Sequence, residues 1–211
     1  MGFFIDALRQ GGPFMWPLLL SVPVCLGLFI VRLQKAQKQE LPGLGLALVS
    51  GLVAFGLFGA AAGEGQMWDA VNHASAGNKE TLLKMGMTIS IIPLQFSLVF
   101  ALLVAIGFGT VWTTVRNLEL PPPKGQTAAR WLGFASALLL CSGLAMYFYM
   151  RSLSMGLNDA AANEANAVIP TIATLIDSTS LVAFLAWLLS GIATLVSLAS
   201  IFRGPRMPAA A

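Results

Sequence analysis

Charged residues are scarce in this sequence. Lys, Arg, Asp and Glu make up 10% of its 211 residues, whereas soluble domains carry about 25%. Hydrophobic residues make up 57%, and the mean hydropathy is +0.79. A soluble fold cannot bury that much apolar surface, so the composition excludes a chain built from soluble domains.

Metal-ligating and nucleophilic side chains are also sparse. His73 has no Cys or second His at ligand spacing, which disfavours a metal site. Cys25 and Cys141 both lie in apolar runs, where a thiol behaves as a small hydrophobic group. No nucleophile, base and orienting triad is visible, nor is a Walker or dinucleotide motif. We therefore expect no enzyme activity, no metal and no cofactor.

Long apolar runs are abundant instead. A run of about 20 apolar residues forms a helix that crosses the roughly 30 Å of membrane hydrocarbon. The sequence therefore predicts an all-α, polytopic membrane protein with about five transmembrane helices, the third and fifth unusually long, and with the lipid bilayer as a partner. The expected spans are Phe14–Val31, Leu44–Ala62, Met85–Val115, Trp131–Met150 and Ile172–Phe202. Pro93 is expected to kink the third span.

Basic residues are distributed unequally between the two sides that these spans define. One side is predicted to hold eight of them: Arg32, Lys35, Lys38, Arg116, Lys124, Arg130, Arg203 and Arg206. The other holds four: Arg9, Lys79, Lys84 and Arg151. The positive-inside rule makes the first side cytoplasmic, with the N-terminus outside and the C-terminus inside. Because the net charge of +3 is explained as a topology signal, no nucleic-acid partner is invoked.

Spans two to five suggest two versions of one two-helix unit. Setting Leu44 over Leu132 also sets Asn78 over Asn166 without a gap, although the identity is sparse. The expected organisation is a first helix with a basic loop (1–40), a two-helix unit (41–118), a Pro-rich cytoplasmic linker (119–130) and a second, repeated unit (131–211).

Three segments carry a resemblance to a known family. Residues 11–20 read Gly-Gly-Pro-Phe-Met-Trp-Pro-Leu-Leu-Leu, residues 56–59 read Gly-Leu-Phe-Gly and are followed by Gly63, and a long apolar helix begins at Met85. In order and spacing these segments resemble the MotA/TolQ/ExbB proton channel family, in its ExbB/TolQ branch. The chain looks like an atypical five-span member.

The resemblance implies a function as well as a fold. It implies a subunit of the bacterial inner membrane, with a periplasmic N-terminus, that forms a homo-oligomeric ring, a pentamer, around a single-span partner of the ExbD/TolR kind. Such a complex couples proton entry to mechanical work in the envelope. Where this family often carries threonine and glutamate, the chain has Ala60 and Ile89. These two residues favour an alternative, a non-conducting scaffold of the same fold, and the repeated units leave a small-solute transporter as a further alternative.

Asp177 is the predicted proton-pathway carboxylate, because it is the acid embedded in an apolar run and would restore an acid in the register of Ile89. Thr174, Ser178 and Thr179 surround it and are predicted to line the same path, or else to bond carbonyls of their own helix. The alternative for Asp177 is a hydrated position at the outer interface, since it follows Pro170 by seven residues.

Small residues at helical spacing predict close helix contacts. Gly56, Gly59 and Gly63 form one such set, and Ser190 and Thr194 belong to another. Small side chains let helix backbones approach each other, which favours packing and assembly over catalysis at these positions.

Overall fold

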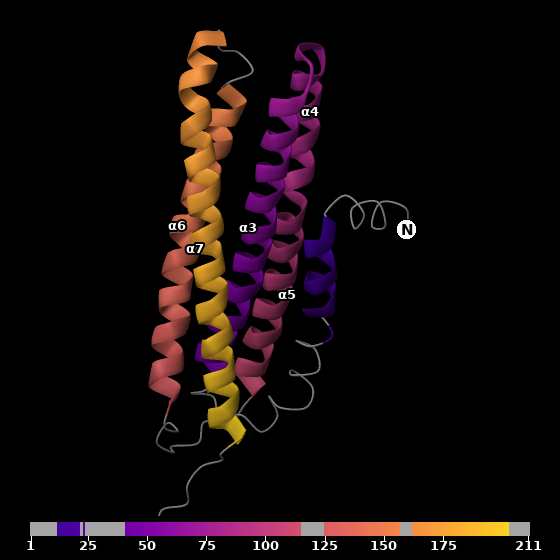
Figure 1. The fold of residues 1–211 in the computed structure, drawn as a ribbon. Coiled ribbons are helices and arrows are strands. Elements are labelled where there is room, and N and C mark those ends of the chain that lie inside the picture. The colour runs from indigo at the N-terminus through magenta and orange to yellow at the C-terminus, as the bar shows by residue number, and fades with distance from the viewer. Residues whose placement is uncertain (1–11, 22, 24–40, 115–124, 157–161, 203–211) are drawn as a thin grey trace, which may run out of the picture.

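The computed structural model describes residues 12–21, 23, 41–114, 125–156 and 162–202 (Figure 1). Within this part of the chain every regular element is helical, which confirms the all-α prediction. The elements are a 3-10 turn η1 (Gly12–Phe14), α3 (Leu41–His73), α4 (Ala76–Ser90), α5 (Ile92–Thr114), α6 (Gln126–Gly156) and α7 (Ala162–Phe202). Residues 15–21, directly after η1, are also helical.

Four stretches of the described chain are long and apolar enough to cross a membrane, which supports a membrane protein. They are Gly43–His73, Thr81–Thr110, Gln126–Gly156 and Val168–Ala199. Half of the first predicted span, Phe14–Val31, lies outside the described residues, so the count of five stays a prediction. A helix is the natural form for these stretches, because it pairs backbone groups internally where no water is present.

The third predicted span is divided between α4 and α5. The break lies at Ile91, and helical bonding resumes where the Gln95 N–H donates to the Ile91 carbonyl at 3.0 Å. Pro93 explains the break, because it has no N–H to donate and its ring crowds the preceding turn. The proline kink expected from the sequence is therefore present as an interruption.

Helix α3 lies at the centre of the arrangement. It packs against α5 and α4 on one side and against α6 and α7 on the other (Figure 1). About 61% of its most apolar stretch is buried inside the bundle, compared with 28% of the corresponding stretch in each of the other three candidate spans. Helices α6 and α7 form an antiparallel pair, and η1 lies against α3 (Figure 1). The helix that begins at Gln126 includes the last five residues of the predicted linker 119–130.

Hydroxyl groups connect three helices within the apolar part. The Ser136 hydroxyl on α6 lies 2.7 Å from the Ala186 carbonyl oxygen of α7, to which it donates, and 3.2 Å from the Ser50 hydroxyl of α3. Such interhelical hydrogen bonds contribute about 0.6 kcal/mol each in membrane proteins. They join the second predicted unit to the first.

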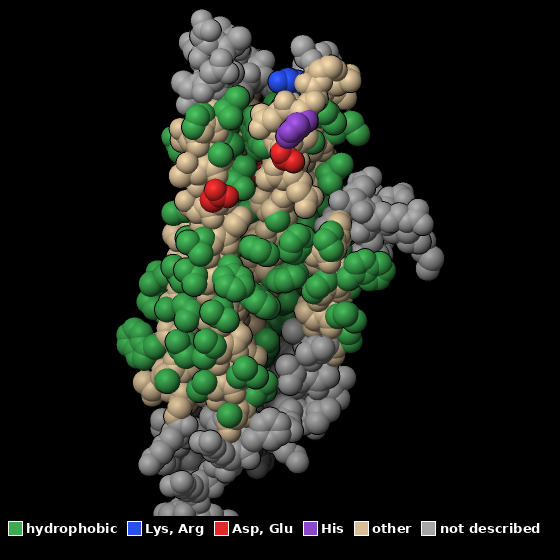
Figure 2. Space-filling view, in the orientation of Figure 1, with side chains coloured by type: hydrophobic (Ala, Val, Ile, Leu, Met, Phe, Trp, Pro, Cys, Tyr) green, Lys and Arg blue, Asp and Glu red, His purple; other side chains and the backbone are tan. Residues whose placement is uncertain are grey.

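The outside of the bundle is apolar. Large hydrophobic side chains are exposed along α5, α6 and α7, among them Leu102, Leu103, Ile106, Trp131, Leu138, Leu181 and Leu195. Figure 2 shows that hydrophobic side chains cover most of the visible face, whereas the charged side chains in view lie toward one end. A continuous apolar surface of this kind marks a membrane or protein interface, so this surface fits lipid contact.

Candidate functional site

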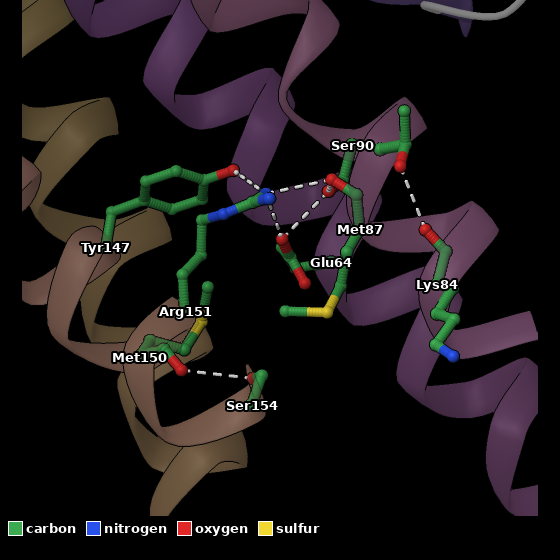
Figure 3. Close-up of polar contacts among 9 residues, drawn as sticks. Glu64, Lys84, Met87, Ser90, Tyr147, Met150, Arg151 and Ser154 are labelled. Atoms are coloured by element: carbon green, nitrogen blue, oxygen red, sulfur yellow. Dashed lines mark hydrogen bonds and ion pairs between the residues drawn. The ribbon is translucent and has the colours of Figure 1, made fainter. Parts of the chain in front are cut away.

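A buried ion pair joins α3 to α6. Glu64 of α3 is completely buried, and the side chain of Arg151 on α6 is 13% exposed. Arg151 Nη1 lies 3.0 Å from Glu64 Oε1 (Figure 3). Burying two charges costs several kcal/mol each unless further hydrogen bonds satisfy them, so the surrounding groups decide whether this pair is stable.

The neighbouring helices supply those hydrogen bonds. Arg151 Nη1 also donates to the Met87 carbonyl of α4 at 2.9 Å and to the Tyr147 hydroxyl at 3.2 Å. Its guanidinium carbon lies 5.8 Å from the centre of the Tyr147 ring, within the range of a cation–π contact. The Ser90 hydroxyl on α4 donates to Glu64 Oε1 at 2.8 Å. We call Glu64, Arg151, Ser90 and Tyr147 the charged cluster.

The charged cluster lies at one end of the uncharged stretches. At the other end, a Cβ on Gly43 of α3 would lie 3.2 Å from Cγ of Arg130 on α6, so these two residues are level. Arg151 follows Arg130 by 21 residues, which is about 31 Å along a helix and matches the roughly 30 Å of hydrocarbon. If Gly43 and Arg130 mark one boundary of the hydrocarbon, the charged cluster marks the other.

A cavity of about 240 Å³ adjoins the charged cluster. Ser90 belongs to both, because it lines the cavity and its hydroxyl donates to Glu64. The remaining lining comes from η1, α3, α4 and α5, and consists of Gly12, Pro13, Phe14, Gly59, Gly63, Gln66, Met67, Gly86, Ile89 and Pro93. Four of these residues are glycines, so the walls include exposed backbone as well as apolar side chains.

Asp177 lies on the exposed surface of α7. The preceding residue, Ile176, faces Gly65 of α3, which sets Asp177 at the height of the charged cluster but on the outside of the bundle. The three hydroxyl side chains predicted to line a path with Asp177 face different surroundings. Thr174 is exposed and bonds the Pro170 carbonyl at 3.0 Å, Ser178 is half-buried, and Thr179 is fully buried with no hydrogen-bond partner among the described residues. The role of Asp177 in a proton pathway stays a prediction.

The predicted packing glycines of α3 face α5, α4 and η1. A Cβ on Gly56 would collide with Ser97 and lie 2.8 Å from the Pro93 carbonyl oxygen, and one on Gly63 would lie 3.2 Å from Ser90. A Cβ on Gly59 would lie 3.0 Å from Phe14 and 3.1 Å from Pro93.

The second predicted packing set lies on α7. Ser190 faces Gly51 of α3, and its hydroxyl bonds the Trp187 carbonyl at 2.8 Å. Thr194, which is half-buried, bonds the Ser190 carbonyl at 2.8 Å.

The charged cluster was not predicted as a group from the sequence. The sequence assigned Arg151 to the outer side as a loop charge; α3 and α6 continue past Glu64 and Arg151 and bring the two side chains together. One signal was present: the register that sets Leu44 over Leu132 sets Glu64 over Ser152, next to Arg151. Opposite charges at corresponding positions of the two predicted units would have indicated a pair.

The chemistry available to the charged cluster is that of a carboxylate held by an arginine. Among the described residues, no group of three His, Cys, Asp or Glu side chains could hold a metal ion. No family model, curated protein or solved structure matches the chain.

The contacts of the charged cluster hold α3, α4 and α6 together. Its carboxylate is also a group that can accept and release a proton.

Proposed function

We propose that this chain is a MotA/TolQ/ExbB-like subunit of an energy-transducing complex in the bacterial inner membrane. In this proposal copies of the chain form a ring that works with a single-span partner of the ExbD/TolR kind, and the proton-motive force drives the complex. The N-terminus is periplasmic and the C-terminus cytoplasmic.

One contact carries the proposal. Two of the segments that resemble the family are far apart in sequence and pack together: Phe14 lies against Gly59, and its ring meets Phe58 edge-on with the ring centres 5.6 Å apart. Phe14 also lies 5.9 Å from Phe55, measured between ring centres. The missing side chain of Gly59 makes room for Phe14, so the Gly-Leu-Phe-Gly motif has a physical reason to accompany the Gly-Gly-Pro-Phe motif.

The exposed apolar face supports an assembly within the membrane. Helices α5 and α7 pack on different sides of α3. Their exposed large hydrophobic side chains are available to lipid or to neighbouring copies. The test is to purify the chain with its native neighbours and image the particle. A ring of several copies with a single-span partner in its centre supports the proposal, and a compact monomer overturns it.

A non-conducting scaffold is the second candidate, because Arg151 already neutralises Glu64 and Ala60 is a buried apolar residue. Proton flux into liposomes that contain the purified complex distinguishes the two, since a scaffold leaves the flux at the level of empty liposomes. A small-solute transporter is less well supported. Transporter sites lie near the bilayer midplane, whereas this cavity adjoins the charged cluster at one end of the apolar stretches.

A further inference from the structure

Glu64 has one oxygen in use and one free. Oε1 accepts from Ser90 and Arg151, whereas Oε2 is buried and has no hydrogen-bond partner within the described residues. An unsatisfied buried oxygen costs about 1–3 kcal/mol, more if it is charged, so each one needs an explanation such as a water or a proton.

Trp68 has the complementary shortage one turn further along α3. Its indole Nε1–H is buried and finds no acceptor among the described residues. Residues four apart lie on the same face of a helix, so the two groups are on the same side of α3. A water molecule that bridged them would satisfy both, since buried waters bridge polar groups of this kind.

Arg151 has partners besides Glu64. Its Nη1 also donates to the Met87 carbonyl and the Tyr147 hydroxyl, and the guanidinium lies over the Tyr147 ring. A neutral Glu64 leaves Arg151 without its counter-charge, which destabilises the charged cluster. The guanidinium nevertheless keeps two hydrogen-bond acceptors when the carboxyl gains a proton.

Ser90 connects Glu64 to the cavity. The Ser90 residue lines the cavity wall, and its hydroxyl lies 2.8 Å from Glu64 Oε1. A hydroxyl group both donates and accepts, so it can receive a proton on one side while it releases one on the other.

We propose that Glu64 is a proton-binding carboxylate that exchanges with water in the cavity through the Ser90 hydroxyl. A hydronium ion in the cavity gives a proton to Ser90 Oγ as Ser90 passes its own proton to Glu64 Oε1, the oxygen that it bonds, which leaves water in the cavity and a neutral carboxyl. The charged and titratable groups that face Glu64 are Arg151 and Tyr147, both on α6. Lys84 of α4 points away from it (Figure 3), and Asp177 of α7 is exposed on the outside.

This inference rests on the proposed function for its biological role, since it names the carboxylate that a proton-driven complex would use. The proton-binding step itself is measured on the purified full chain in lipid nanodiscs. Its failure therefore leaves the ring assembly, which the imaging experiment tests, undecided.

The experiment is infrared difference spectroscopy between neutral and acidic buffer, in which a carboxyl that gains a proton produces its own carbonyl band. We expect a band in the native chain that Glu64→Gln removes. Asp177→Asn, which removes the exposed acid at the same height, is the matched control and should keep that band. Ser90→Ala should keep the final amplitude and slow its appearance after a pH jump, because the ion pair stays and the connecting hydroxyl is gone.

Two results overturn the inference: no difference between the native and Glu64→Gln spectra, or a band that Asp177→Asn removes and Glu64→Gln keeps. Glu64→Gln leaves Arg151 without its carboxylate, so this variant can fail to fold. In that case Ser90→Ala decides, because it keeps the charges. An unchanged rate of proton uptake in Ser90→Ala rules out the route through the hydroxyl.

Discussion

At the scale of single residues, the Glu64–Arg151 pair connects the two halves of the described bundle. It is bonded to α4 through Ser90 and Met87, so three helices depend on two charged side chains. Removing one partner of a buried pair leaves the other charge uncompensated, and this is far more destabilising than removing both.

The first prediction follows from that asymmetry. Arg151→Met should lower the free energy of unfolding by about 3–5 kcal/mol, because a buried carboxylate loses its counter-charge. The double variant Glu64→Gln with Arg151→Met should recover part of that loss, since neither charge remains. Urea unfolding in a mild detergent, followed by circular dichroism, measures all the variants.

Arg130→Met is the matched control, because it removes an exposed arginine at the other end of the same helix. It should change the free energy of unfolding by less than about 1 kcal/mol. Equal losses in Arg151→Met and Arg130→Met would contradict a stabilising role for the buried pair.

At the scale of helices, the contact of α3 with α4 and α5 depends on a stripe of small residues. Gly56 and Gly63 face Ser97 and Ser90, with Pro93 between those two serines on the facing chain. Backbones that approach this closely gain van der Waals contact that lipid tails cannot supply. The break at Ile91 lies directly beside this stripe.

The second prediction tests the stripe. Gly56→Ala should destabilise the protein by about 1–3 kcal/mol, because the added methyl group collides with Ser97 and with the Pro93 carbonyl. Gly109→Ala on α5 is the control, since nothing lies within 4 Å of its Cβ position. The control should be neutral, or stabilising by up to about 1 kcal/mol from helix propensity. Thermal unfolding of both variants gives the comparison, and a neutral Gly56→Ala would show that the helices separate without cost.

The helices were predictable from the sequence, and the charged cluster was not. Runs such as Trp131–Met150 are apolar around the whole helix, so their length alone indicates a span. Hydropathy says little about where a helix ends once it leaves the apolar region. Helix α6 therefore extends beyond its predicted span at both ends, and α7 extends beyond its predicted span at the N-terminal end. A window average also cannot distinguish an acid that faces inward, such as Glu64, from one that faces outward, such as Asp177. That distinction depends on which helix lies opposite.

At the scale of the whole molecule, the four candidate spans alternate in direction, and loop charge predicts their orientation in the membrane. The loop between α3 and α4 and the first turn of α6 lie at opposite ends of the bundle (Figure 1). The charged cluster lies toward the first of these ends.

The third prediction concerns this orientation. In a background without Cys25 and Cys141, a membrane-impermeant thiol reagent added to intact cells should label Ala76→Cys and leave Lys124→Cys unlabelled, because basic loops stay in the cytoplasm. Both positions should react once the membrane is opened, which controls for accessibility. The reverse labelling pattern would invert the predicted topology and contradict the proposed ExbB/TolQ-like orientation.

The break at Ile91 changes how a mechanical load would pass through the molecule. On one side of the break, α5 is packed against α3 through Gly56, whereas on the other side α4 is packed against α3 through Gly63 and Gly86. Ser90 of α4 also bonds Glu64 of α3, and the Met87 carbonyl accepts from Arg151 of α6. A force applied to α4 would therefore reach α3 and α6 together through the charged cluster, which lies on the α4 side of the break.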